Sequence, residues 1–249
     1  MSYPILLEVC IDSVESAWAT EVGGAERVEL CGDLLEGGIT PSAGMIAQVR
    51  RRVSIGLQVM IRPRGGDFCY TAGEFEVMKR DILVAKQLGA DGVVLGILDA
   101  DGNVDKARTR QLVDLAQPLN VTFHRAFDMS SNLARALQDV IDAGAQRILT
   151  SGGEPTAEAG AHAIANLVQS AYGRIIIMAG GGIRADNAAN IVAETHVREI
   201  HAGLSVPVPG PMRHRNEKIA MGSADNREYQ RFAVSEETVK SFKAALAGS

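Results

Sequence analysis

Short apolar runs recur along this chain at intervals of about thirty residues, and most of them end in an ionisable, sulfur-bearing or glycine residue. An apolar run of four to eight residues followed by a helical pattern is typical of a parallel strand and its crossover helix. Eight such units predict a TIM (β/α)₈ barrel, in which the chemistry lies at the carboxyl ends of the strands. The predicted strands are Ile5–Ile11, Arg27–Cys31, Leu57–Arg62, Gly92–Leu98, Val121–Phe127, Arg147–Gly152, Arg174–Gly180 and Glu199–Leu204.

Helical patterns occupy the segments between these runs. Ser13 and Ser42 are expected N-caps, and Glu74 follows Thr71 at the spacing of a capping box. Glycines expected at left-handed positions after helices are Gly23, Gly89 and Gly144. The predicted helices are Val14–Val22, Ala43–Arg52, Thr71–Leu88, Asp105–Leu115, Ser131–Ala143, Thr156–Tyr172, Ala185–Thr195 and Val234–Leu246.

Length and composition favour a single domain over residues 1–249, with a long polar loop at 205–232 after the eighth strand. The net charge of −5 argues against nonspecific nucleic-acid binding, which needs a basic surface. No apolar run is long enough for a membrane span, and the first residues lack the pattern of a signal peptide. Three cysteines do not make a disulfide framework. We therefore expect a cytoplasmic protein with reduced thiols.

Strand periodicity predicts an unusually polar barrel interior, because alternate residues of a strand face opposite sides. Buried carboxylates are costly unless they are paired, so this set indicates either a site or a structural layer of ion pairs. Glu8 and Glu29 would repel each other, raising one pKa, or would both pair with Arg62. The polar residues expected to point inward are Glu8, Glu29, Arg62, His124, Glu199 and His201, together with the thiols of Cys10 and Cys31.

Two strand ends carry groups suited to acid–base work or to orienting a substrate. His124 and Asp128 combine a titratable base with a carboxylate, although a single buried histidine is often only a core residue. Arg62 has the planar fork that binds carboxylate or phosphate, and Arg64 follows it on a glycine-containing loop. The candidate catalytic residues are Glu8, Glu29, Arg62, His124 and Asp128.

Glycines after the sixth, seventh and eighth strands predict a binding site for an anion. Glycine lets backbone N–H groups approach an anion, and many barrels hold a phosphate at the loops after strands seven and eight. The alternative is that these glycines only make tight turns. The candidate anion-binding residues are Arg64, Ser151, Gly152, Gly180, Gly181, Gly182 and Gly203.

Cys10 and Cys31 occupy equivalent inward positions on adjacent strands. Soft thiolates select Cu(I) or Zn, and His124, His201 or Met60 are further candidate ligands. The spacing is not that of a known metal motif, and buried cysteines are commonly small core residues. The metal candidates are therefore Cys10, Cys31, His124 and His201.

Several long motifs resemble the CutC family, whose members are described as copper homeostasis proteins. The motifs are Val28–Cys31 with Glu36–Ser42, Ile61–Tyr70, Leu98–Asp105, Thr122–Asp128, Leu149–Gly152 and Met212–Asn216. The resemblance covers essentially the whole chain. It implies a TIM-like barrel, a cytoplasmic homodimer, and copper handling by thiols, which here would be Cys10 and Cys31, with Cys69 a weaker candidate.

The resemblance and the residues therefore favour two functions. The first is cytosolic Cu(I) binding or trafficking. The alternative is an enzyme acting on a small phosphorylated or carboxylated metabolite, with Arg62 orienting the anion and Glu8, Glu29 or His124 moving protons. The expected partner is accordingly a metal ion or a small anionic ligand. The segment Met212–Arg215 folds over the barrel mouth, makes a dimer contact or is a solvated loop.

Overall fold

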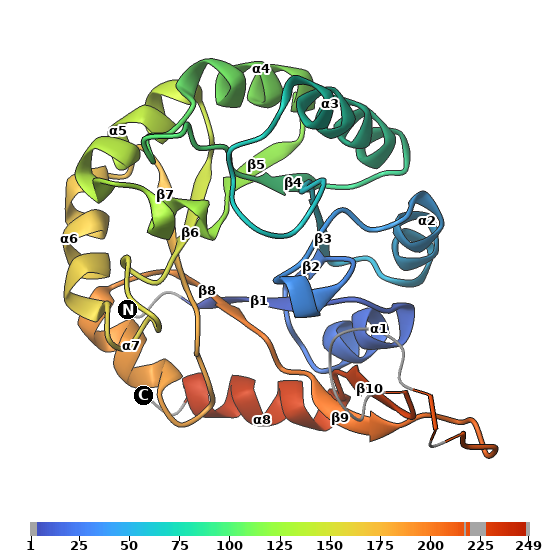
Figure 1. The fold of residues 1–249 in the computed structure, drawn as a ribbon. Helices are drawn as coiled ribbons and strands as arrows, with labels where there is room; N and C mark the ends of the chain where they lie inside the picture. The colour runs from blue at the N-terminus through green and yellow to red at the C-terminus, as the bar shows by residue number, and fades with distance from the viewer. Residues whose placement is uncertain (1–3, 217, 220–227, 248–249) are drawn as a thin grey trace.

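The computed structural model is a closed barrel of eight parallel strands surrounded by helices (Figure 1). It describes residues 4–216, 218–219 and 228–247. Each strand is hydrogen-bonded to the next, and β1 closes the barrel on β8. The TIM-barrel prediction is confirmed. The strands are β1 (Leu6–Ile11), β2 (Arg27–Leu30), β3 (Gly56–Met60), β4 (Gly92–Leu95), β5 (Asn120–Phe123), β6 (Arg147–Thr150), β7 (Ile176–Gly180) and β8 (Glu199–Ala202).

The helices form the outer ring of the barrel. They are α1 (Val14–Val22), α2 (Ala43–Arg52), α3 (Ala72–Gln87), α4 (Lys106–Ala116), α5 (Leu133–Ala143), α6 (Ala161–Ala171), α7 (Ala188–Thr195) and α8 (Glu236–Ala247). Short 3₁₀ turns, η1 (Leu34–Glu36) and η2 (Arg125–Met129), follow β2 and β5. In Figure 1, α8 lies between α7 and α1 and completes the ring.

Local capping chemistry sets several helix ends as predicted. Ser13 and Ser42 accept hydrogen bonds from backbone N–H groups in the first turns of α1 and α2. Thr71 and Glu74 form the predicted capping box at the start of α3. Gly89 and Gly144 adopt the expected left-handed conformation.

Gly23 differs from this expectation, because its φ is −70° and the left-handed residue is Gly24. A Cβ atom at Gly23 would lie 2.4 Å from the Cβ of Val239 in α8. Glycine is therefore needed at this position for close packing of α8 against the end of α1.

The outward faces of the strands build the main core against the helices. Leu7 and Val9 of β1 and Val28 of β2 are fully buried there. A smaller apolar cluster lies inside the barrel and consists of Cys31, Met60 and Val94, with Cys10 and Leu34 packed against it. The predicted division of the strands into an apolar outer face and a polar inner face therefore holds.

The segment after β8 contains two strands where a loop was expected. β9 (Val206–Pro209) pairs antiparallel with β10 (Gln230–Ala233) and forms a hairpin stem beside α1 and α8 (Figure 1). Residues 211–216, beyond β9, are all exposed, and the chain there runs away from the barrel (Figure 1). The basic stretch Met212–Arg215 therefore does not cover the barrel mouth in this chain.

None of the helices within the described ranges combines the length and the apolar character required to cross a membrane.

Candidate functional site

A network of ion pairs fills the lower part of the barrel interior. The guanidinium of Arg27 bonds Glu8 and Glu199 at 2.5 Å each, and Arg147 bonds Glu199 at 2.6 Å. Strand register explains the first contact, because Glu8 and Arg27 are direct partners across β1 and β2. All four side chains are almost fully buried, so their mutual pairing offsets the cost of removing the charges from water.

This network corrects the expected pairing of the carboxylates with Arg62. Arg62 instead donates to the backbone carbonyls of Glu36, Gly38 and Gly66. The partners of Glu8 and Glu199 are Arg27 and Arg147. Arg147 was missed, although counting back two and four residues from Ser151 along β6 places it on the inner face.

His201 of β8 connects this ion-pair layer to the barrel mouth. Its Nδ1 lies 2.8 Å from Glu8 Oε1, and its Nε2 lies 3.8 Å from Glu29 Oε2. Burial raises the pKa of Glu8, but the hydrogen bond to His201 and the charge of Arg27 outweigh it and lower that pKa to about 2. Burial lowers the pKa of His201, but the charge of Glu29 and contacts with Cys10 and Glu8 raise it well above its usual value.

Cys10 and Cys31 meet above this histidine, at the carboxyl ends of β1 and β2. Their Sγ atoms are 3.8 Å apart, and Cys31 Sγ lies 3.5 Å from Glu29 Oε2. The chain passes tightly over them, because a Cβ at Gly38 would lie 2.9 Å from Cys31 Sγ. Cys31 is buried and Cys10 is partly exposed.

The ionisation of this cluster is uneven. The hydrogen bond from Cys31 lowers the pKa of Cys10, burial opposes this, and His201 lowers it further, to about 5. The same contact with Cys10, together with burial, raises the pKa of Cys31. Burial also raises the pKa of Glu29 well above its usual range. Cys10 is therefore the thiol of the pair that loses its proton more readily.

Two overlapping triads in this cluster have the spacing of metal ligands. Cys10, Glu29 and Cys31 form one, and Glu8, Glu29 and His201 form the other, with all ligand atoms of each triad within 4.8 Å. Glu29 Oε1 is buried without a hydrogen-bond partner. A two-sulfur donor set with an adjacent imidazole fits a soft or borderline metal ion. His124 belongs to neither triad.

His124 and Asp128 have separate hydrogen-bond partners in this structure. His124 Nδ1 accepts the backbone N–H of Ala126, and burial and the charge of Arg62 lower the pKa of this histidine to about 3. Asp128 accepts hydrogen bonds from Thr150 Oγ1 and from the Ser151 and Gly153 backbone N–H groups. Asp128 thus fastens the loop after β5 to the loop after β6.

The residues predicted to bind an anion come together only in part, since a Cβ at Gly181 would lie 3.3 Å from the Cβ of Ser151 and 3.2 Å from the guanidinium of Arg125. Arg64 is held by Glu74 and Asp67, at 2.6 and 3.1 Å. Gly180 ends β7 and Gly181 and Gly182 follow it, but α7 begins only at Ala188, so its N-terminus does not follow the glycines directly. Gly203 lines a separate cavity of about 470 Å³ beside the start of α8, together with Arg184 and Glu237. Ser151 and Gly152 lie in the loop that Asp128 fastens.

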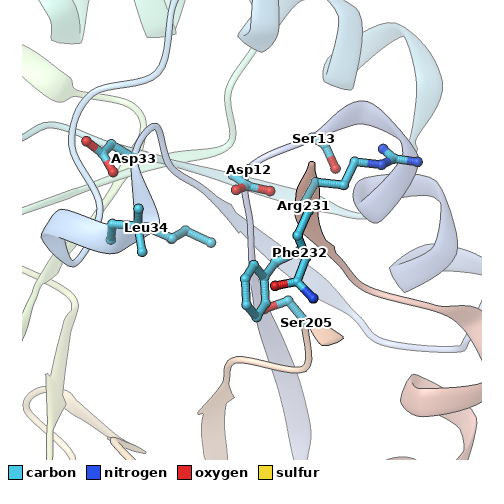
Figure 2. A pocket seen from close by; sticks show the side chains of 9 residues that line it. Asp12, Ser13, Asp33, Leu34, Ser205, Arg231 and Phe232 are labelled. Carbon is cyan, nitrogen blue, oxygen red and sulfur yellow. The ribbon is translucent and has the colours of Figure 1, made fainter. Parts of the chain in front are cut away.

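A cavity of about 570 Å³ lies at the carboxyl ends of β1 and β2 (Figure 2). Figure 2 shows Asp12 and Asp33 from the loops after β1 and β2, and Arg231 and Phe232 from β10. Leu34 lines this cavity and also packs against the cluster that contains Cys31. Sequence reasoning missed this cavity, because its far wall comes from the hairpin that was expected to be a loop.

Comparison with known proteins identifies the family of this chain. A profile of the CutC family matches residues 5–206. The chain belongs to the CutC family.

Similar proteins cover between 79% and 97% of this chain. A CutC family protein of Chromobacterium violaceum is 48% identical over 97% of this chain and 98% of its own. A mouse protein named copper homeostasis protein cutC homolog is 48% identical over 88% of this chain and 80% of its own. The crystal structure of a putative copper homeostasis protein CutC from Streptococcus agalactiae matches with a TM-score of 0.76 and 37% identity, over 79% of this chain and 97% of that one.

Proposed function

We propose that this CutC protein takes part in copper homeostasis by binding Cu(I) through Cys10 and Cys31. The observation that carries the proposal is the pair of thiols 3.8 Å apart at the carboxyl ends of neighbouring barrel strands. Thiolates are the ligands that select Cu(I) over harder ions. The names of the mouse and streptococcal relatives, which refer to copper homeostasis, support the same function.

The spacing of the thiols suits one shared ion. Two metal–sulfur bonds of about 2.3 Å, the length of a zinc–thiolate bond, separate the sulfurs by about 3.8 Å at a tetrahedral angle and about 4.0 Å at the trigonal angle of three ligands. This matches the distance between Cys10 Sγ and Cys31 Sγ, so binding needs little rearrangement of β1 and β2.

His201 is the proposed third ligand. Its Nδ1 is bonded to Glu8, which leaves Nε2 on the side of Glu29 and the thiols. A carboxylate that holds the second nitrogen of a metal-binding imidazole is a recurrent arrangement, since it fixes the orientation of the ring. Glu8 therefore acts as the positioning residue for His201.

The cavity at the ends of β1 and β2 is the proposed route to the thiols. Its lining carries two carboxylates, Asp12 and Asp33, and one guanidinium, Arg231, and this net negative charge favours a cation over an anion. Cys10 is the partly exposed member of the pair and is expected to meet the ion first.

A competition titration of the reduced protein with a chromogenic Cu(I) chelator tests this function. We expect one Cu(I) per chain, and a loss of affinity of more than about 100-fold in Cys10→Ser/Cys31→Ser, because removing ligands costs more than removing their outer-shell partners. Cys69→Ser is the matched control, since Cys69 is exposed and outside the cluster. Unchanged affinity in the double variant, or tighter binding of Zn(II) than of Cu(I), would contradict the proposal.

Family membership also favours a cytoplasmic homodimer. The hairpin and its exposed extension offer apolar side chains for a contact between two copies, since Val206 and Met212 are 41% and 57% exposed. We propose this surface as the dimer contact, in place of the lid over the mouth that the sequence also allowed.

A further inference from the structure

Arg62 and His124, which lie outside the thiol cluster, are two buried donors without acceptors. Arg62 is 6% exposed and His124 is 4% exposed. Arg62 Nε and His124 Nε2 both lack a hydrogen-bond partner among the residues that the structure describes. An unsatisfied buried polar group costs about 1–3 kcal/mol, so two in one region call for a missing acceptor.

The hydrogen bond at the other ring nitrogen fixes the protonation of His124. Nδ1 accepts the backbone N–H of Ala126 at 3.1 Å, so the proton of the neutral ring is on Nε2. A pKa of about 3, set by burial and the charge of Arg62, keeps the ring neutral at physiological pH. His124 Nε2 is thus an N–H donor, and a ligand atom beside it must be an acceptor.

Arg62 brings a positive charge that no carboxylate neutralises. Its terminal nitrogens are fixed by backbone carbonyls of the loops after β2 and β3, and no ion pair within the described part of the chain includes it. Arg27 and Arg147, by contrast, share Glu8 and Glu199. A buried cation without a counterion favours a ligand with one negative charge.

The ring of Phe68 lies close to both Arg62 and His124. Its ring centroid is 5.0 Å from the His124 ring and 5.0 Å from the guanidinium carbon of Arg62. Gly96 leaves room for the histidine, because a Cβ there would lie 2.6 Å from the ring. Tyr70 is buried beside Arg62, and burial raises its pKa to about 12 against the lowering effect of the Arg62 charge and contact, so its hydroxyl keeps its proton.

We propose that Arg62 and His124 bind the carboxylate of a small monoanionic metabolite, whose oxygens accept hydrogen bonds from Arg62 Nε and His124 Nε2. A carboxylate supplies the acceptors that both donors lack and the single negative charge that Arg62 lacks. The proposal does not depend on copper binding, because no residue of the two thiol triads takes part.

The test is a titration followed by NMR with ¹⁵N-histidine-labelled protein, using acetate, glycolate, L-lactate and pyruvate as probes. We expect at least one of them to shift the His124 Nε2–H resonance with saturation, whereas acetamide, the neutral analogue of acetate, does not. His124→Asn is the key variant, since its side-chain oxygen can replace Nδ1 as acceptor for Ala126 while the Nε2 donor is lost. We expect its carboxylate affinity, measured by calorimetry, to fall at least tenfold.

Other outcomes would overturn the proposal. No saturable shift with any of the four carboxylates would mean that an internal water satisfies the donors, and stronger binding of inorganic phosphate would exclude the carboxylate class. Equal affinity in His124→Asn and in the unsubstituted protein would remove His124 from the site. Cys10→Ser/Cys31→Ser should bind the carboxylate normally, so failure of the copper proposal and failure of this one are distinguishable.

Discussion

Glu8 is the residue on which the interior of the barrel depends. It is fully buried and bonds both Arg27 and His201. Removing one member of a buried charge network leaves its partners uncompensated, which costs far more than the loss of a surface pair. The Glu8→Gln variant, which removes this charge, therefore tests how much the network stabilises the fold.

We expect Glu8→Gln to lower the free energy of unfolding by about 3–5 kcal/mol. Glu76→Gln is the control, since Glu76 pairs with Lys79 on the surface, and such pairs contribute at most about 1 kcal/mol. Urea unfolding at pH 7 measures both. A Glu8→Gln variant as stable as the Glu76→Gln control would mean that the network does not stabilise the fold.

The same residue gives a pH dependence. Burial raises the pKa of Glu8, but His201 and the arginines lower it from 4.5 to about 2. A carboxylate whose pKa is lower in the folded state stabilises the protein above its unfolded pKa, and this contribution is lost as the pH falls. The stability difference between the unsubstituted protein and Glu8→Gln should therefore shrink between pH 4.5 and 2. A difference that stays constant over this range would contradict the assignment.

At the scale of elements, the sequence predicted best where a helix end is set by neighbours in the chain. α1 and α2 have the predicted bounds, because Ser13 and Ser42 cap them locally. α6 begins five residues later than predicted. A Cβ at Gly160, just before it, would lie 1.9 Å from the carbonyl oxygen of Ser151. That close approach to the loop after β6 is a long-range contact, which helical periodicity cannot reveal.

Substitution of glycine by alanine is expected to have opposite effects at Gly23, where α8 packs against the end of α1, and at Gly44 in α2. Gly23→Ala places a Cβ 2.4 Å from Val239 and should destabilise the protein by about 1–3 kcal/mol through overpacking. Gly44→Ala, in α2, meets nothing closer than 3.9 Å and should stabilise it by up to about 1 kcal/mol through helix propensity. Thermal unfolding of both variants checks the signs. A neutral Gly23→Ala would show that α8 is loosely docked.

At the scale of the whole molecule, the sequence could tell which residues face inward but not the level at which each one lies. Period two placed Glu8, Glu29 and Arg62 inside, yet Glu8 is level with Arg27, whose partner on β3 is Gly56. Arg62 is six residues farther along, or about 20 Å at the rise of a strand. Which inward side chains pair with each other depends on the stagger of the strands, and this stagger cannot be read from a single sequence. Arg62 therefore lies near the barrel mouth, where it donates to the carbonyl of Gly38, the residue that also packs against Cys31.

Assembly is the expectation that belongs to the complete chain. Light scattering of the reduced protein should give about twice the chain mass of 26.4 kDa. Met212→Asp, on the exposed extension of the hairpin, should shift the mass toward the monomer. A monomer at micromolar concentration without substitution would contradict the homodimer.

The most direct test of the central claim is anomalous scattering at the copper edge from crystals of the reduced protein soaked anaerobically with Cu(I). The account predicts one peak between the Sγ atoms of Cys10 and Cys31, on the side of His201 Nε2. A peak at the exposed Cys69 alone, or none at the paired thiols, would contradict the assignment of this barrel mouth as a copper site.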